Sequence, residues 1–445
     1  MTRPADGSAA LWTTIDQLLS STSNALLLFV LAQVATVSEF GVVSLQIAIV
    51  MAWIGFNRGA VGTPVLLVSN LSKREILAEG GYATAFSILS GTAAVMAILA
   101  VGWAAGDVAM AVALGVVIPV VLAQDVARYP AIASGRPLVA VVADAAWALG
   151  MAGLFAANIA GAGVSVETAI LLWGALGLLS ATVLVAGTPI RPHLDRIGSW
   201  WKMYSPARIR FGATYATVAL STAATAGLVT VIAGADVAGG LRGASSLFGP
   251  IMMLIMAVPM VFVPHVRRTS ASPRAQWRLL VKTSSITSTL AIAATALVIA
   301  VPTPMGGWIL GQTWESAITA VPFIGLECAA NCWIVGLYSW LQAQGMGRKL
   351  FQLRALHVSL QLGAAAVAAL AVGTLVAVAS ALAVSCWLMA LIGLVVVGRA
   401  SRRKPTTRPA PQAPSQNSVA HDPARPWPTI DVLDDELVRT AARTR

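Results

Sequence analysis

Charged side chains are scarce in this chain of 445 residues. Only 11% of the residues are Asp, Glu, Lys or Arg, whereas 57% are hydrophobic. An ordinary soluble protein is about 25% charged, so this chain has too few polar groups to cover a folded domain with a wetted surface. The composition therefore predicts an integral membrane protein.

Cysteine is also rare, since the chain has only Cys328, Cys332 and Cys386, all inside apolar segments. No spacing typical of a zinc site or a haem attachment is present, so we expect no metal and no cofactor. Cys328 and Cys332 lie one helical turn apart and are interpreted as packing residues. The motif G-x-x-x-x-G-K-[ST], which cradles nucleotide phosphates, is missing as well, which argues against an ATP-driven pump.

Long apolar runs dominate the sequence as far as residue 398. A helix needs about 20 apolar residues to cross the hydrocarbon core of a bilayer. Runs of this length predict about twelve transmembrane helices, with the count uncertain by one: 11–35, 40–68, 82–106, 108–127, 137–158, 167–187, 209–233, 241–264, 280–301, 316–341, 351–372 and 375–398.

Basic residues exceed acidic ones, 29 to 18, for a net charge of +11. They lie between the apolar runs and not in one soluble patch, which argues against binding to nucleic acid. Of the 29, 27 fall in the termini and in connections on one side, while Arg242 is assigned to an opposite connection and Arg58 to a span. Because basic loops stay in the cytoplasm, both termini are predicted to be cytoplasmic.

The last 45 residues, 401–445, are rich in Pro and Arg. A segment of this composition buries too little apolar surface to offset its chain entropy, so a disordered cytoplasmic tail is predicted. A short amphipathic turn at 430–438 is a candidate docking segment.

An internal repeat is visible around the long connection at 188–208, which separates two groups of six spans. Each group opens with a helix, a tight acidic turn and a second helix. The two turns are Val37-Ser38-Glu39-Phe40-Gly41 and Ala235-Asp236-Val237-Ala238-Gly239. Transporters built from parallel repeats show this organisation, with the binding site between the halves. We therefore predict an N-terminal lobe at 1–190, a cytoplasmic linker at 191–208, a C-terminal lobe at 209–400 and the tail at 401–445.

Several short polar motifs recur in and beside the predicted spans of the first half of the chain. They are Asp16-Gln17, Ser20-Ser21, Ser23-Asn24, Ser38-Glu39-Phe40-Gly41, Arg58-Gly59, Gly62-Thr63-Pro64, Gln124-Asp125-Val126-Ala127-Arg128-Tyr129 and Ser134-Gly135-Arg136-Pro137. These motifs resemble the Wzx-type polysaccharide flippases of the multidrug/oligosaccharidyl-lipid/polysaccharide (MOP) exporter superfamily. The resemblance is good over about 10–190, weaker over 205–400 and absent in the tail.

The resemblance implies an all-α, MATE-like fold in which two six-helix lobes form a V. It further implies that the protein is a flippase, which is a transporter and not an enzyme. The expected location is a bacterial cell membrane. Such a protein carries a polyprenyl-diphosphate-linked oligosaccharide from the inner to the outer leaflet by alternating access. The expected partners are the lipid-linked glycan, the bilayer, H⁺ or Na⁺ as a coupling ion, and glycan-assembly proteins bound through the tail.

Polar residues in the first two spans are candidates for the site, because ionisable groups within a membrane usually face a cavity or a partner. Asp16, Ser20, Ser23 and Asn24 share an arc of about 100° on one helix, which would face either the lumen or a neighbouring helix. Arg58 lies at a similar depth in the second span. It is interpreted either as a ligand of the diphosphate or as the partner that neutralises Asp16.

Further candidates lie deeper in the chain. Glu327, with Asn331 on the same face, is placed near the bilayer midplane, either for a proton-coupled step or as a hydrogen-bonded group between helices. Asp125 and Arg128 are predicted to form a local ion pair, and Asp144 either pairs with Arg128 or Arg136 or lines the cavity. Four hydroxyl residues of the seventh span are candidates for sugar contacts or, with more weight, for helix packing: Thr214, Thr217, Ser221 and Thr225.

Three other functions compete with the flippase. A MATE-like multidrug or cation antiporter would need an acidic lumen, and Arg58 argues weakly against it. A membrane glycosyltransferase or polymerase acting on prenyl-linked sugars would need catalytic acids or large loops on the outer side, where only short turns are predicted. A scaffold that recruits glycan enzymes through its tail is the third alternative.

Overall fold

The computed structural model describes residues 6–67, 72–252, 254–255, 258, 262, 273–344 and 346–402. Every regular element in these ranges is a helix. Their bounds are α1 (Asp6–Val34), α2 (Val37–Asn57), η1 (Arg58–Gly62), α3 (Thr63–Leu67), α4 (Lys73–Ala105), α5 (Val108–Ala133), α6 (Pro137–Ile159), α7 (Val166–Gly187), α8 (Ile197–Ala233), α9 (Ala235–Leu247), α11 (Pro273–Ile299), α12 (Thr303–Leu310), α13 (Thr313–Ala343), α14 (Gly347–Ala371) and α15 (Leu375–Arg402).

Ten helices of the described ranges are long and apolar enough to cross a membrane, and the bent pair Arg208–Thr217 and Ala219–Ala233 within α8 makes up to eleven. These agree with eleven of the twelve predicted spans. The remaining one, 241–264, lies partly outside the described residues, as do nearly all of the predicted tail and its amphipathic turn. The all-helical membrane fold is therefore confirmed.

Short capped turns separate the spans. Thr36 and Glu39 form a reciprocal capping box that starts α2 directly after α1, and Ser72 and Glu75 do the same for α4. Gly106 ends α4 with φ +75°, a left-handed conformation that glycine adopts without strain. These signals fix where one span stops and the next begins.

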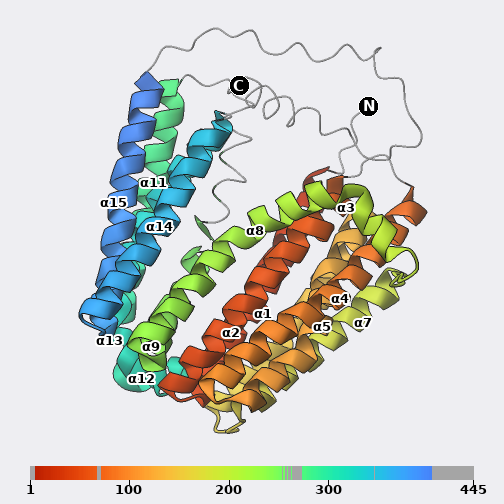
Figure 1. Ribbon diagram of the computed structural model, residues 1–445, viewed down its shortest axis with the longest axis horizontal. Coiled ribbons are helices and arrows are strands. Elements are labelled where there is room, and N and C mark those ends of the chain that lie inside the picture. The colour runs from red at the N-terminus through yellow and green to blue at the C-terminus, as the bar shows by residue number, and fades with distance from the viewer. Residues whose placement is uncertain are drawn as a thin grey trace.

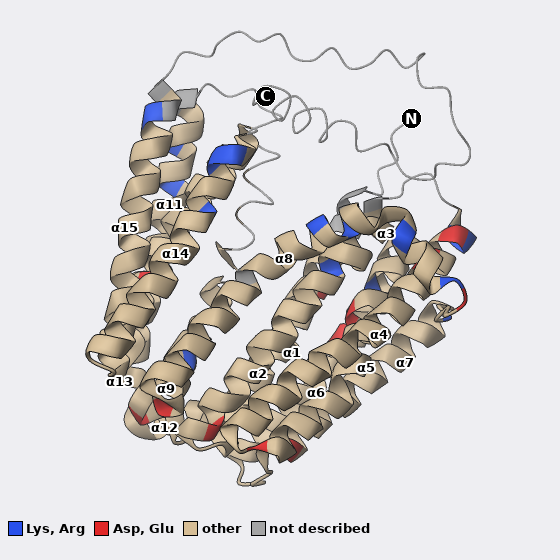
Figure 2. Cartoon of the chain, viewed as in Figure 1, with Lys and Arg blue, Asp and Glu red and all other residues tan. Residues whose placement is uncertain are grey.

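The helices diverge from one end into a V (Figure 1). Helices α1 to α7 form one arm, and α11, α13, α14 and α15 form the other, while α9 and α12 lie where the arms meet. Figure 2 shows Lys and Arg gathered toward the wide end of the V. The V is thus open toward the end that carries the basic residues.

The hydrophobic core is continuous where the arms meet and divided where they diverge. One cluster of buried side chains joins both arms, with Phe40 and Val43 of α2, Leu241 of α9 and Trp314 and Ile324 of α13. Toward the wide end the core is divided. A second cluster around Trp340 and Met389 belongs to one arm, and a third around Val61 and Tyr129 belongs to the other.

Helix α8 lies along α2 and also contacts α14. A Cβ on Gly59 would meet the carbonyl group of Phe211, so the backbones of η1 and α8 are nearly in contact there. In the segment predicted as a linker, 191–208, residues 197–208 form the first turns of α8.

Candidate functional site

Arg58 opens a single turn of π-helix, η1, between α2 and α3. Such bulges insert one extra residue into a helix and are frequent at functional sites. Gly62 lies against the ring of Tyr129, where a Cβ would come within 2.9 Å of ring carbons. The π-turn therefore brings the Arg58 side chain close to α5.

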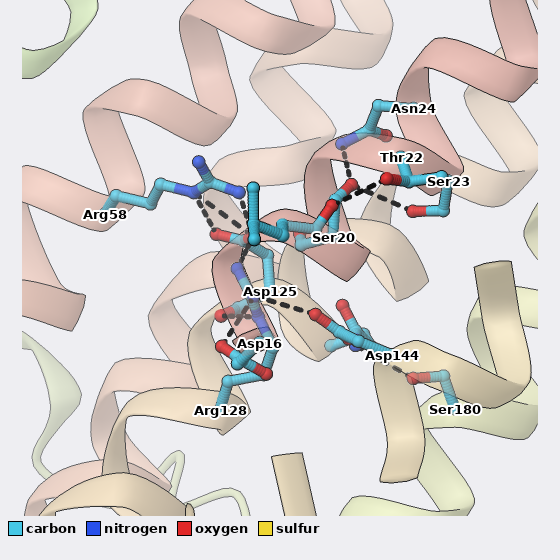
Figure 3. Close-up of polar contacts among 12 residues, drawn as sticks. Asp16, Ser20, Thr22, Ser23, Asn24, Arg58, Asp125, Arg128, Asp144 and Ser180 are labelled. Atoms are coloured by element: carbon cyan, nitrogen blue, oxygen red, sulfur yellow. Dashed lines mark hydrogen bonds and ion pairs between the residues drawn. The ribbon is translucent and has the colours of Figure 1, made fainter. Parts of the chain in front are cut away.

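Arg58 forms a bidentate ion pair with Asp125 of α5 (Figure 3). Its Nη2 donates to Oδ1 over 2.6 Å and its Nε donates to Oδ2 over 2.9 Å. The Arg58 side chain remains 25% exposed, whereas that of Asp125 is 6% exposed. The predicted pairing of Arg58 with Asp16 is wrong, because Asp125 occupies that place.

Arg128, which is buried, connects three carboxylates from three helices. Its Nη1 donates to Asp16 of α1 over 3.1 Å and to Asp144 of α6 over 2.8 Å, and its Nη2 donates to Asp125 over 2.5 Å. The predicted local pair of Asp125 and Arg128 is confirmed. Of the alternatives for Asp144, the structure selects Arg128, since Arg136 donates to the carbonyl of Gly187.

One amide side chain, Gln124, and one hydroxyl side chain, Ser180, complete the cluster. The Nε2 of Gln124 donates to Oδ1 of Asp144 over 2.7 Å and to Oγ of Ser180 on α7 over 2.9 Å. Neither residue was a predicted member of the site. Gln124 belongs to the motif at 124–129 that carries the resemblance, whereas the only signal for Ser180 was a polar residue within a span.

The polar face of α1 turns toward neighbouring helices. Asp16, Ser20 and Ser23 are buried. The Ser23 hydroxyl and the Asn24 amide both donate to the carbonyl of Ser20, over 2.9 and 3.0 Å. Of the two predicted orientations, the structure favours the neighbouring helix for this face, and the lumen is lined by other residues.

A separate pocket of about 130 Å³ lies between the arms, near the narrow end of the V. It is lined from six helices, α2, α8, α9, α13, α14 and α15. Most of the lining side chains are small, several of them hydroxyl residues. Its polar lining residues are Ser44, Ser221, Thr222, Thr225, Arg242, Ser245, Glu327 and Gln361.

Arg242 lies in a different place from the one predicted from the sequence. It does not lie in an outer connection but in the second turn of α9, where it lines the pocket. Within the described part of the chain it has no acidic partner, and its buried Nε has no hydrogen bond. The pocket therefore holds a guanidinium that forms no ion pair with a described carboxylate.

Glu327 of α13 lines the same pocket. Its Oε1 accepts a hydrogen bond from Nε2 of Gln361 over 3.2 Å. The same amide contacts Sγ of Cys386, which lies 3.5 Å from Nε2 of His357. Asn331, one turn from Glu327, is half-buried and outside the pocket lining.

The predicted site residues thus lie in two places. Asp16, Asp125, Arg128, Asp144 and Arg58 form a buried network within one arm, whereas Glu327 lies between the arms. Among the α8 hydroxyls, Thr214, Thr217 and Thr225 donate to carbonyls four residues back, over 2.7 to 2.9 Å. Thr225 also lines the pocket.

Comparison with known proteins identifies the fold. No protein-family model matches the chain, and no curated protein sequence matches it. Among solved structures, the inward-facing conformation of a multidrug resistance MATE transporter of the MOP superfamily is similar with a TM-score of 0.64 and 12% identity, over 87% of this chain and 97% of that one. The outward-facing conformation of such a transporter gives 0.57 and 13%, over 88% and 94%.

A third similar structure is a MOP superfamily transporter from Pyrococcus furiosus, for which a binding pocket of reversed polarity suggests a different function. It gives a TM-score of 0.58 and 14% identity, over 88% of this chain and 94% of that one. The chain therefore has the fold of the MOP transporters over most of its length.

Proposed function

We propose that the protein is a flippase that carries a polyprenyl-diphosphate-linked oligosaccharide across the membrane by alternating access. The observation that carries this proposal is Arg242. Arg242 is half-buried, and an unpaired charge withdrawn from water is costly, so a guanidinium kept in the pocket wall favours an anionic ligand. Arginine binds phosphate oxygens through paired, charge-assisted hydrogen bonds.

The rest of the pocket suits the remainder of such a substrate. The hydroxyls of Ser44, Ser245 and Thr225 line it beside Arg242 and are of the kind that bond to sugars. The prenyl chain would stay in the lipid alongside the arms. In this proposal Arg58 has a structural role, because Asp125 already holds two of its nitrogens.

The orientation belongs to the same proposal. With the basic end of the V in the cytoplasm, both termini lie on the cytoplasmic side of a bacterial cell membrane. The pocket then receives its substrate from the inner leaflet, where lipid-linked sugars are assembled. The lobes at 1–190 and 209–400, joined by 191–208, then move against each other. A role for the tail in binding glycan-assembly proteins concerns residues outside those described.

A multidrug or cation antiporter is the second candidate, and Glu327 is the observation that favours it. A carboxylate in the pocket wall would attract a cationic drug or a proton. Solved MATE transporters share the fold. The two candidates differ in which charged residue of the pocket binds the cargo.

Replacing Arg242 separates the two functions. In a strain that depends on this protein for surface polysaccharide, Arg242→Ala should reduce export at least about tenfold, and Arg242→Lys should restore part of it. Arg278→Ala, which removes an exposed arginine outside the pocket, is the matched control. Normal export by Arg242→Ala at equal protein level, with drug susceptibility raised by Glu327→Gln, would reject the flippase in favour of the antiporter.

A further inference from the structure

Two glycines bring the backbones of α2 and α9 together at the narrow end of the V. A Cβ on Gly41 would lie closer to the carbonyl oxygen of Ala235 than the 3.0 Å that real Cβ atoms respect. A Cβ on Gly239 would collide in the same way with the carbonyl oxygen of Val37. Both obstacles are backbone atoms, which cannot rotate aside as a side chain can.

The contact is reciprocal. The two segments predicted as acidic turns are the helix starts themselves: Val37 and Gly41 lie at the start of α2, and Ala235 and Gly239 at the start of α9. Each glycine meets the first residue of the opposite helix. Equivalent residues exchanging equivalent contacts are the mark of a two-fold axis, so the two repeats meet here across a pseudo-two-fold axis.

This crossing forms the narrow end of the pocket. Gly41 and Ala238 line the pocket, and Ser44 and Arg242 lie one helical turn inward from the two glycines. A second contact closes the same end, where Nε2 of Gln33 on α1 donates to the carbonyl of Trp308 on α12 over 2.6 Å. The pocket is therefore separated from the narrow end by helix backbones in contact.

We propose that the glycine crossing is the outer gate of the transporter, and that Gly41 and Gly239 set the balance between its two open states. The gate closes only because neither residue has a side chain, and it opens when α2 and α9 separate. This inference needs alternating access but not a particular cargo in the pocket.

Alanine at either glycine should shift the protein toward the state that is open at the narrow end. In the closed state the added methyl group meets a backbone carbonyl. In the separated state it meets nothing, and alanine favours a helix more than glycine does. A substitution that acts on one state only changes their ratio.

Gly227 of α8 provides a matched control. A Cβ there would lie 3.5 Å from Cδ1 of Leu45, an ordinary van der Waals contact. Gly227→Ala makes the same chemical change at a contact between α8 and α2, and we expect it to leave the gate unchanged.

The test needs no substrate. In a variant with Cys328, Cys332 and Cys386 replaced by alanine, Ser44→Cys reports whether the pocket is reached by a membrane-impermeant maleimide added to intact cells. Labelling should be slow with the native glycines and with Gly227→Ala, and about tenfold faster or more with Gly41→Ala or Gly239→Ala. Equal rates in all four proteins would overturn the proposal.

A cross-link gives a second measurement that does not depend on the glycine variants folding. Gln33→Cys and Trp308→Cys, joined by a short bismaleimide, should hold the narrow end closed and abolish the remaining labelling of Ser44→Cys. Labelling that persists after complete cross-linking would show that the gate lies elsewhere. Loss of polysaccharide export plays no part in either readout, so failure of the flippase proposal would leave this result intact.

Discussion

At the scale of single residues, Arg128 is the residue that links the helices of the buried network. One guanidinium binds three carboxylates that come from α1, α5 and α6. The network contains three carboxylates and two guanidiniums, so when every group is ionised it has one negative charge in excess. Such a cluster has the composition needed to take up one proton, as a transporter that uses H⁺ as its coupling ion would require.

Removing Arg128 should break the network and lower the stability of the folded protein. Arg128→Ala leaves three buried carboxylates facing one another, and breaking a buried pair in this way costs about 3–5 kcal/mol. Thermal unfolding of the purified protein, followed by fluorescence, should show a markedly lower Tm. Arg136→Ala removes an exposed arginine with a backbone contact only, and an equal loss of Tm in that control would refute the assignment.

Arg58 tests which arginine binds the cargo. Because Asp125 keeps its contact with Arg128 when Arg58 is removed, we expect Arg58→Ala to lower stability by about 1–3 kcal/mol while most export persists at equal protein level. Surface polysaccharide measured per molecule of membrane-inserted protein gives the answer. Abolished export with normal insertion would assign the diphosphate to Arg58 instead.

At the scale of helices, the sequence predicted where the spans lie but not which neighbouring helix each polar side chain faces. Asp16 and Arg58 are at similar depths, yet depth leaves the rotation of each helix undefined, and the π-turn at η1 rotates Arg58 toward α5. Arg242 was misplaced for a related reason. Helix α9 begins immediately after Gly234, so a charge about two turns inside the helix looks, by hydropathy, like part of the connection.

The start of α8 packs against α4 through contacts of Trp200 that could not be predicted from the sequence. Nε1 of Trp200 donates to Glu79 over 2.8 Å, and the guanidinium of Arg208 lies 3.6 Å above the Trp200 ring. Tyr82 stacks on the same indole. The first turns of α8 should therefore move with the arm formed by α1 to α7.

Trp200→Ala should release this segment. We expect trypsin to cut at Arg196 or Lys202 several-fold faster, because the local opening free energy falls, while the Arg128 network stays intact. Trp103→Ala removes an indole that is 80% exposed and should leave the cleavage rate unchanged. Unaltered proteolysis of Trp200→Ala would mean that other contacts hold the segment.

At the scale of the whole molecule, the distribution of charge predicts the orientation in the membrane. In a cysteine-free protein, Ala162→Cys in the turn between α6 and α7 should react with an impermeant maleimide in intact cells. Ser199→Cys, near the basic end, should react only after permeabilisation, because basic ends remain cytoplasmic. Both residues are exposed. The opposite pattern would reverse the proposed direction of transport.

The reciprocal contact of Gly41 and Gly239 has a consequence for how the two repeats can diverge. One collision is enough to keep α2 and α9 apart, so the second glycine loses its purpose once the first is replaced. The double variant should therefore behave like either single variant, a strongly non-additive result. Duplication thus provides no spare copy of the gate, since a change in either repeat disables both.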